Sequence, residues 1–230
     1  STARNSGARQ ARGRVLVFVD DDCVPDAEIL VELRKSFLDN PDALVGGRVE
    51  HGCTDNFWST VTHATTSAAY ELHEVRDRRP RRFSTSVLAV PREAFLDVGG
   101  FDESFALPGG EDYEFCERWG HSGRPARYVP SAGVVHFHPL TFAQFVRQQF
   151  RYGRGLSRTH QLAKGQDQGR SRGAQVRGTL RLVPHPLKPN KGIRSLELAA
   201  GILVAQTVTA VGATWEWKGP RVKSTGISGE

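Results

Sequence analysis

The sequence of 230 residues predicts an α/β fold, and three observations lead to this class. Short apolar runs rich in β-branched residues are typical of buried strands, and they occur at 15–19, 43–52, 84–91 and 133–137. Segments with apolar residues at helical spacing stand between these runs. The composition, with 38% hydrophobic and 24% charged residues, is that of a globular protein without repeats. We therefore expect a sheet with helices around it.

The first strand leads directly into a run of acids. Val15 to Val19 predicts a central strand covered on both faces, and Pro25 prevents its simple continuation. Asp26 is expected to cap a helix, whose apolar positions are Ile29, Leu30, Leu33 and Phe37. The three acids at 20 to 22 would then lie at the carboxyl end of a strand, where open α/β sheets bind ligands.

The acid run has two interpretations. Alternation along a strand places Asp20 and Asp22 on one side and Asp21 on the other. Two carboxylates about 6.5 Å apart repel each other by roughly 2.5 kcal/mol at an effective dielectric constant of about 20. A divalent cation would relieve this repulsion, because Mg²⁺ is usually held by one or two carboxylates together with substrate phosphates. The alternative is a solvated acidic turn that caps the following helix.

The later elements follow from the same patterns. In chain order we expect a strand at 43–52 with a Gly-Gly interruption, a helix at 56–75, a basic loop DRRPRRF at 77–83, a strand at 84–91 and a short helix at 92–98. Gly99 and Gly100 should end that short helix. A strand at 133–137 precedes an amphipathic helix that begins at Thr141, with one apolar side formed by Phe142, Phe145, Val146 and Phe150.

Two further polar clusters are candidates for chemistry. Glu111 and Asp112 follow the Pro-Gly-Gly turn at 108–110 and precede a short helix. Carboxylates at a helix N-terminus are stabilised by the dipole, but one of them could also act as a general base. His136 and His138 lie on the same side of a strand by alternation, so they are either structural or metal ligands.

The charge distribution and the cysteine content indicate which partners and which cellular environment to expect. The net charge is +6, but residues 147–194 alone carry twelve Lys or Arg and one acid. Such a basic stretch suits an anionic membrane surface or a diphosphate-bearing substrate. We see no zinc-finger or RNA-recognition signature and expect no nucleic-acid partner. The three cysteines, which are few and far apart, argue against a disulfide scaffold and against a Cys-based zinc site, and they fit a reducing cytosolic environment.

Composition also divides the chain. We expect a domain at 1–155, a basic linker rich in Gly, Arg and Pro at 156–194, an apolar helix at 195–218 and a tail at 219–230. Residues 198–215 lack charges, and Trp217 and Lys218 follow them as typical interface anchors. The helix is therefore either membrane-inserted or membrane-lying, or an ordinary helix that docks on the domain.

A series of motifs resembles a known family. ARNSGARQARG is followed by VLVFVDDDCVPD, then by VPREAFLDVGGFDESF, GGEDYEFCERW and YVPSAGVVHFH. Over about residues 3–155 their order and spacing are similar to the C-terminal two-thirds of a family 2 inverting glycosyltransferase. This resemblance implies a GT-A fold, a Rossmann-like mixed sheet, here incomplete at the N-terminus and followed by C-terminal helices. It also implies binding of a nucleotide-diphospho-sugar and of a divalent metal, Mg²⁺ or Mn²⁺.

The resemblance implies roles for individual residues. Asp22 is the expected direct metal ligand, with Asp20 nearer to the ribose or sugar, and a further ligand comes from His136 with His138 as its alternate. Asp112 is the expected catalytic base, and Glu111 would share in binding the acceptor or donor sugar. The expected donor-binding residues, besides Asp20, are Arg4, Asn5, Gln148, Arg151 and Tyr152. The last three read Q-x-x-R-Y where processive members have Q-x-x-R-W, which puts processive synthesis in doubt.

These residue types suit a single inverting displacement. Asp112 would take the proton of an acceptor hydroxyl as it attacks the anomeric carbon, the metal would neutralise the departing diphosphate, and Arg151 would add a second positive contact. The expected acceptor is a glycan or a lipid-linked molecule, in keeping with cell envelope polysaccharide synthesis. We expect a cytoplasmic location, with the cytoplasmic face of a membrane as the narrower prediction.

The sequence departs from the family pattern at its start. The family has an early strand, helix and D-x-S-x-D segment before the R-N-x-G stretch, and these are not present. One interpretation is a truncated glycosyltransferase; another is a non-catalytic fragment, or a subunit that completes its site with a partner chain. A metal-dependent hydrolase that uses the acid run and the histidines is a third.

Overall fold

The computed structural model describes residues 1–74, 82–105, 109–166 and 193–218. Within them, five strands form one sheet in the order β1-β4-β3-β5-β2. The strands are β1 (Val15–Phe18), β2 (Cys23–Pro25), β3 (Leu44–His51), β4 (Leu88–Pro91) and β5 (Ala126–His136). β3 and β5 run parallel and the other neighbours are antiparallel, so the sheet is mixed, as predicted.

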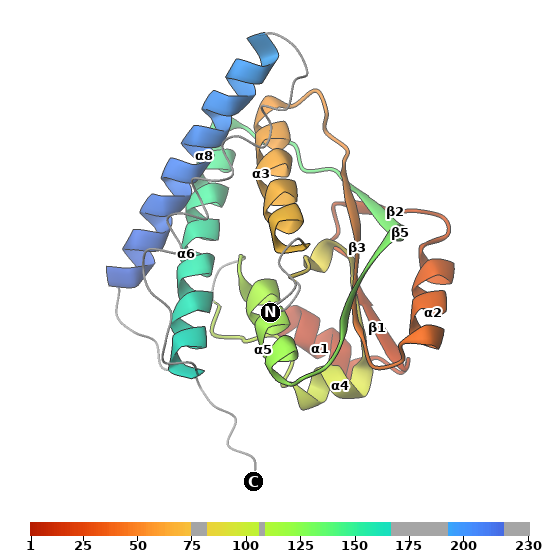
Figure 1. Cartoon of the computed structure of the whole chain (residues 1–230). Helices are drawn as coiled ribbons and strands as arrows, with labels where there is room; N and C mark the ends of the chain where they lie inside the picture. The colour runs from red at the N-terminus through yellow and green to blue at the C-terminus, as the bar shows by residue number, and fades with distance from the viewer. Residues whose placement is uncertain (75–81, 106–108, 167–192, 219–230) are drawn as a thin grey trace.

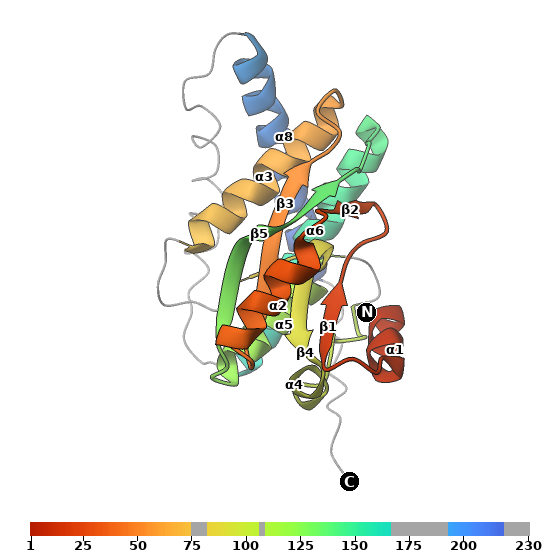
Figure 2. The same cartoon turned by 90° about the vertical axis from the view of Figure 1, so that its right-hand side faces the viewer.

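Helices cover both faces of this sheet. α2 (Ile29–Asp39) lies on one side, and α1 (Thr2–Gln10), α4 (Arg92–Asp97) and α5 (Glu111–His121) lie on the other (Figure 1). Next to them, α3 (Phe57–Glu74), α6 (Phe142–Gln166) and α8 (Ile193–Lys218) form a group in which α8 is farthest from the sheet (Figures 1 and 2). A 3₁₀ turn, η1 (Thr85–Val87), precedes β4.

Each layer is held by its own apolar cluster. The α2 face buries Ile29 and Leu33 against Val45 and Val134 of the sheet. The opposite face buries an aromatic group made of Phe95, Phe101, Phe115 and Trp119. A third cluster joins the outer helices and contains Val61, Leu140, Phe145, Ile202 and Ala205. Because α5 and α6 each contribute to a buried cluster, the side chains they present to the site rest on rigid supports.

The prediction for the first strand was half right. Residues 15–18 do form a strand, but β1 lies at an edge of the described sheet and pairs with β4 alone. Val17 and Val19 are 38% and 39% exposed, so this run is not covered on both faces. An apolar run reports strand propensity, whereas the elements that cover it lie elsewhere in the sequence.

The helix after the acid run also differs in detail. α2 begins at Ile29 with Glu28 at its cap position, while the carboxylate of Asp26 accepts a hydrogen bond from Arg48 at 3.0 Å instead of capping the helix. Leu30 is 67% exposed, although its spacing predicted a core position. Arg48, from strand β3, pairs with Asp26, and this partner cannot be identified from the local sequence.

Other boundaries follow the predictions with a few shifts. Gly99 and Gly100 end α4 with φ of 90° and 66°, conformations that favour glycine. β5 begins at 126 instead of 133, and the expected strand at 84–91 begins as the η1 turn. α6 continues to Gln166, so residues 156–166 of the predicted linker are helical, and Phe142 is 53% exposed. α8 matches the predicted apolar helix, whereas most of DRRPRRF and of the linker lies outside the described residues.

Candidate active site

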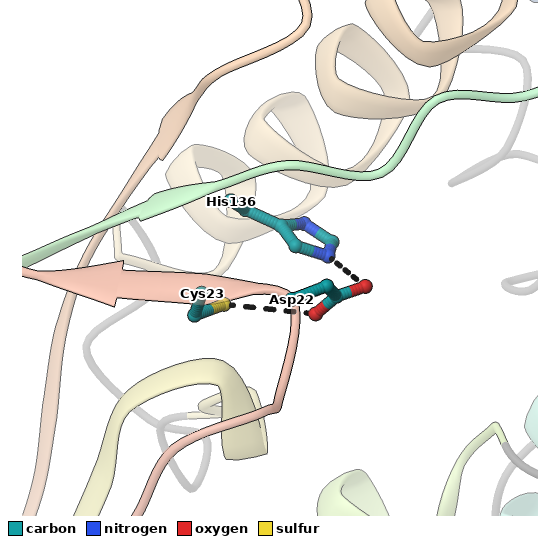
Figure 3. Close-up of side chains that lie close together, drawn as sticks. All are labelled: Asp22, Cys23 and His136. Atoms are coloured by element: carbon teal, nitrogen blue, oxygen red, sulfur yellow. Dashed lines mark hydrogen bonds and ion pairs between the residues drawn. The ribbon is translucent and has the colours of Figure 1, made fainter.

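Asp22 and the two histidines meet at one edge of the sheet. β2 and β5 pair so that Cys23 lies opposite His136, and the backbone N–H of Phe137 donates to the carbonyl of Asp22 at 2.8 Å. The same Asp22 oxygen, Oδ2, lies 3.1 Å from Nε2 of His136 and 3.0 Å from Nδ1 of His138. Figure 3 shows the Asp22 carboxylate turned towards the ring of His136. One carboxylate and two imidazoles therefore face a common point.

This donor set fits a divalent cation. Carboxylate oxygen and imidazole nitrogen suit Mn²⁺ and its neighbours, and the half-buried positions leave room for a substrate oxygen as a further ligand. The thiol of Cys23 lies close to Asp22 and His136 and could complete a softer site (Figure 3). Burial, together with the charges of Asp20 and Asp22, raises the pKa of Cys23 to about 11, so without a metal ion the thiol is protonated at neutral pH.

Gln148 contacts Nε2 of His138, the ring nitrogen that does not contact Asp22. Its amide Nε2 lies 3.0 Å from Nε2 of His138, and its Oε1 accepts from the hydroxyl of Thr62 at 3.4 Å. A partner on the outer ring nitrogen fixes the orientation and tautomer of a ligating histidine. The sequence predicted Gln148 to bind the donor, whereas the structure places it next to the metal-binding side chains.

Replacing Gln148 by leucine should therefore weaken metal binding without removing a ligand. We expect the affinity for Mn²⁺ to fall about 10-fold to 100-fold, the range typical of such supporting partners. Titration of the full chain with Mn²⁺ followed by calorimetry measures this directly. Gln144→Leu is the matched control, because Gln144 is exposed on the same helix and bonds to Thr141; an equal loss in both variants would contradict the supporting role.

The two acidic clusters are joined by Arg4. Its guanidinium pairs with Oδ1 of Asp20 at 2.6 Å and with Oε1 of Glu111 at 3.2 Å. The hydroxyl of Ser86 donates to the other oxygen of Asp20 at 3.1 Å, so both oxygens of this carboxylate already have partners. Asp20 and Glu111, which are 91 residues apart in the chain, thus both pair with the guanidinium of Arg4.

The alternation argument for the acid run does not hold, because residues 20–23 form a turn. The N–H of Cys23 donates to the carbonyl of Asp20 at 3.1 Å, and β2 starts only at Cys23. Asp20 faces Arg4, Asp22 faces the histidines, and Asp21 is exposed. Of the four predicted metal ligands, the structure thus brings together Asp22, His136 and His138 but directs Asp20 elsewhere.

Asp112 has the properties of a general base. It lies in the first turn of α5, after Gly110 in the left-handed conformation with φ of 96°. Burial raises the pKa of Asp112 to about 7, with the charges of Glu111 and Asp20 adding to this effect, while the N–H of Tyr113 and the charge of Arg4 oppose it. A carboxyl group with a pKa near neutrality can accept a proton from a substrate at physiological pH.

The structure shows the contacts of several residues that the sequence predicted to bind the donor. Glu111 is buried, and its oxygens accept from Arg4 and from the N–H of Gly109, which holds the turn before α5. The buried amide of Asn5 bonds to both backbone groups of Phe101, so it anchors α1 and does not face the site. Tyr152 lines the neighbouring cavity, and burial, followed by the charge of Tyr113, raises its pKa.

A cavity of about 300 Å³ opens beside the histidine pair. Besides His136, His138 and Tyr152 it is lined by hydroxyl and imidazole groups from β3, α3 and the η1 region, including His51, Thr62, His63, Thr66, Ser67 and Ser86. His51 and His63 stack with ring centroids 5.0 Å apart, and burial, with the charges of His51 and His136, lowers the pKa of His63 to about 4. Arg48 and Arg82 also line the cavity, so it can hold a ligand that is rich in hydroxyls or carries negative charge.

Sequence reasoning did not identify His51 and His63. The available signal was the end of β3, because β3 and β5 run parallel and pair His51 with His136 in register. Side chains at the carboxyl ends of parallel neighbours share one edge, but the sequence does not show which strands are neighbours.

The sequence is similar to a known protein family and to characterised relatives. Residues 1–155 match the family model described as "Glycosyltransferase like family 2". The chain is 27% identical over 154 residues to "Glycosyltransferase AglE" of Haloferax volcanii, which covers 66% of the chain and 49% of that protein. It is 35% identical over 112 residues to an "N-acetylglucosaminyl-diphospho-decaprenol L-rhamnosyltransferase" of Mycobacterium tuberculosis, covering 49% of the chain and 34% of that protein. The chain thus spans at most about half the length of these relatives.

A solved structure shares the architecture. The "Mannosyltransferase PcManGT from Pyrobaculum calidifontis in complex with GDP-Man and Mn2+" superimposes with a TM-score of 0.56 over 94% of this chain and 66% of its own, at 17% identity. The mixed sheet with flanking helices is therefore a GT-A fold, as the sequence predicted. The family match extends over two-thirds of the residues and includes the acid run, the E-D pair (Glu111 and Asp112) and the histidine pair (His136 and His138). The chain therefore belongs to the glycosyltransferase family 2-like proteins.

Proposed function

We propose that this chain transfers a sugar from a nucleotide-diphospho-sugar to an acceptor hydroxyl, with inversion at the anomeric carbon and with a divalent metal. The observation that carries the proposal is the meeting of three polar clusters from distant parts of the sequence. Arg4 joins the acid run to the E-D pair, and Asp22 of that run contacts both histidines. The proposal extends the family assignment to a reaction class.

In this reaction Asp112 accepts the proton of the acceptor hydroxyl. The hydroxyl oxygen then forms a bond to the anomeric carbon from the face opposite the diphosphate, which leaves with the bonding electron pair. A single displacement of this kind inverts the configuration. The raised pKa of Asp112, about 7, matches a base that works near neutral pH. Arg151 on α6 offers a further positive charge for the donor.

The metal proposal concerns Mg²⁺ or Mn²⁺. Asp22, His136 and His138 would hold it, and when bound it would supply positive charge that stabilises the leaving diphosphate. The archaeal mannosyltransferase with the same fold was solved with Mn²⁺ and GDP-Man, which supports this choice. Asp20, which Arg4 and Ser86 hold at the site, would lie near the ribose or sugar of the donor.

The acceptor that we propose is a glycan or a lipid-linked molecule. The mycobacterial relative is named for a diphospho-decaprenol acceptor, which supports the lipid-linked class and a role in cell envelope synthesis. The cavity beside the histidine pair offers hydroxyl and imidazole groups to the sugar part of such an acceptor, and Arg48 and Arg82 offer positive charge to its phosphates. A cytoplasmic location, where nucleotide sugars are the available donors, is part of the same proposal.

The stereochemical outcome tests the reaction class. The full chain is incubated with Mn²⁺, a panel of nucleotide-diphospho-sugars and a diphospholipid-linked sugar as acceptor, and release of the nucleoside diphosphate identifies the donor. The product's anomeric configuration is then determined by proton NMR. We expect an inverted anomer and no release in the presence of EDTA. A retained anomer, or undiminished release with EDTA, would contradict the proposal.

A further inference from the structure

The outward face of α8 is apolar along most of its length. α8 is the one helix among the described residues that is long and apolar enough to cross a membrane, and the mean hydropathy of its Ser195–Lys218 part reaches 1.6. Only 28% of this apolar window is buried in the fold. The exposed apolar side chains on it are Leu196, Leu203, Val204, Val211, Trp215 and Trp217. We refer to these six as the α8 apolar face.

The exposed charged side chains on the described part of α8 are Glu197 and Lys218, near its two ends. The hydroxyls of Thr207 and Thr214 donate to the carbonyls of Leu203 and Ala210, each at 2.8 Å, so they are satisfied within the helix. Glu216 turns inward and pairs with Arg154 at 2.8 Å. An exposed helix face in water normally carries free charged groups, whereas self-satisfied hydroxyls suit an environment without water.

The inner side of α8 is locked to the domain. A Cβ added to Gly153 of α6 would lie 1.9 Å from the carbonyl oxygen of Thr209, and one added to Gly212 would lie 2.1 Å from that of Phe150. The two backbones therefore touch, and Ile202 and Ala205 complete the contact in the buried cluster of the outer helices. Since α6 brings arginines against this side of α8, the helix cannot be surrounded by lipid and is unsuited to span a bilayer.

We propose that the α8 apolar face lies in the plane of an anionic lipid membrane and binds the protein to its surface. The inference goes beyond the transfer reaction and does not depend on it. Trp215, Trp217 and Lys218 at one end have the composition of an interfacial anchor. By sequence, residues 147–194 carry eleven more positive than negative charges, a composition that is attracted to acidic headgroups. α8 itself lies on the side of the molecule away from α2 (Figures 1 and 2), so the sheet and α2 would remain in water.

Vesicle flotation tests this assignment. The full chain is mixed with vesicles of phosphatidylcholine, with or without phosphatidylglycerol, and its partition is compared with that of a Leu203→Glu/Val211→Glu variant. We expect binding that is stronger with phosphatidylglycerol and weaker at high salt, and a loss on the order of 100-fold in the variant. Circular dichroism and thermal melting confirm that the variant is folded.

A Leu30→Glu/Leu38→Glu variant is the matched control. Leu30 and Leu38 are 67% and 74% exposed on α2, across the sheet from α8, so they should leave partition unchanged. Equal loss in both variants, or no flotation of the wild type, would overturn the proposal. So would a concentration-dependent dimer in sedimentation velocity that only the α8 variant abolishes, because the face would then bind a second copy. Retention on vesicles after alkaline carbonate extraction would exclude the in-plane arrangement.

Discussion

Asp112→Asn should lower the rate of sugar transfer by on the order of 10²–10⁴-fold, the usual contribution of a positioned general base. Asparagine has nearly the shape of aspartate, so the turn at Gly110 and the first turn of α5 should be preserved. Donor binding, which depends on other side chains, should change by no more than about twofold. Single-turnover transfer and equilibrium binding of the donor measure the two quantities separately.

The pH dependence of the wild-type enzyme should follow the same group. The base acts only when deprotonated, and the pKa of Asp112 is raised from 3.8 to about 7 by burial and by the charge of Glu111. Transfer should therefore rise tenfold per pH unit below about 7 and level off above it. Glu111→Gln removes the second cause, so it should move the midpoint of the profile to lower pH. A profile that stays flat down to pH about 5 would exclude Asp112 as the base.

Stability should change in the opposite direction to activity. Because the folded protein binds a proton at Asp112 more tightly than the unfolded chain, the free energy of unfolding falls as pH rises between 3.8 and about 7. The asparagine variant carries no charge there, so above pH about 7 its free energy of unfolding should exceed that of the wild type by about 1–3 kcal/mol. This range lies below the full value of about 1.36 kcal/mol per unit of pKa shift, because solvent screens part of the charge. Near pH 4 the two should melt alike.

Asp21→Asn is the matched control for both measurements. Asp21 lies exposed in the acid run, so its replacement makes the same change in net charge without touching the turn before α5. It should leave the rate, the pH profile and the melting temperature unchanged. If Asp112→Asn and Asp21→Asn behave alike, the effect is one of overall charge and the base has been misassigned.

How much the sequence predicts depends on the range of the interaction. Local patterns located the strands at 15–18 and 44–51, the helices α2 to α6, and the apolar helix α8. They failed for Leu30, which a helical spacing placed in the core, and for the edge position of β1. Burial depends on which element packs against a face, and propensity and periodicity carry no information about that partner.

The candidate site shows the same division. The family motifs led to Asp22, His136, His138 and Asp112, and the structure brings the first three into contact. The contacts of Glu111, Asn5 and Gln148 within the fold were not predicted, because each has a partner distant in sequence, as Glu111 has in Arg4. The motifs therefore predict which residues lie near the site, whereas packing determines the contacts that each side chain makes.

Among these variants, Asp22→Ala should weaken binding of the metal and of the donor the most. It removes the one carboxylate that both imidazoles face, so the affinity for Mn²⁺ should fall on the order of 100-fold or more, beyond the range for supporting partners. Donor binding in the presence of Mn²⁺ should then drop to the level seen with EDTA. Calorimetry with Mn²⁺ alone, followed by titration with the nucleotide sugar, separates loss of the metal from loss of the donor.

Cys23→Ser decides between two kinds of metal centre at the same place. The thiol lies within reach of Asp22 and His136, and a thiolate there would favour Zn²⁺ over Mn²⁺. Asp22, His136 and His138 already supply the oxygen and nitrogen ligands that suit Mn²⁺, so serine should leave the affinity for Mn²⁺ within about twofold. If Cys23→Ser instead loses metal as completely as Asp22→Ala, sulfur is a ligand. The ion would then be Zn²⁺, and the proposed support of the leaving diphosphate by Mg²⁺ or Mn²⁺ would have to be abandoned.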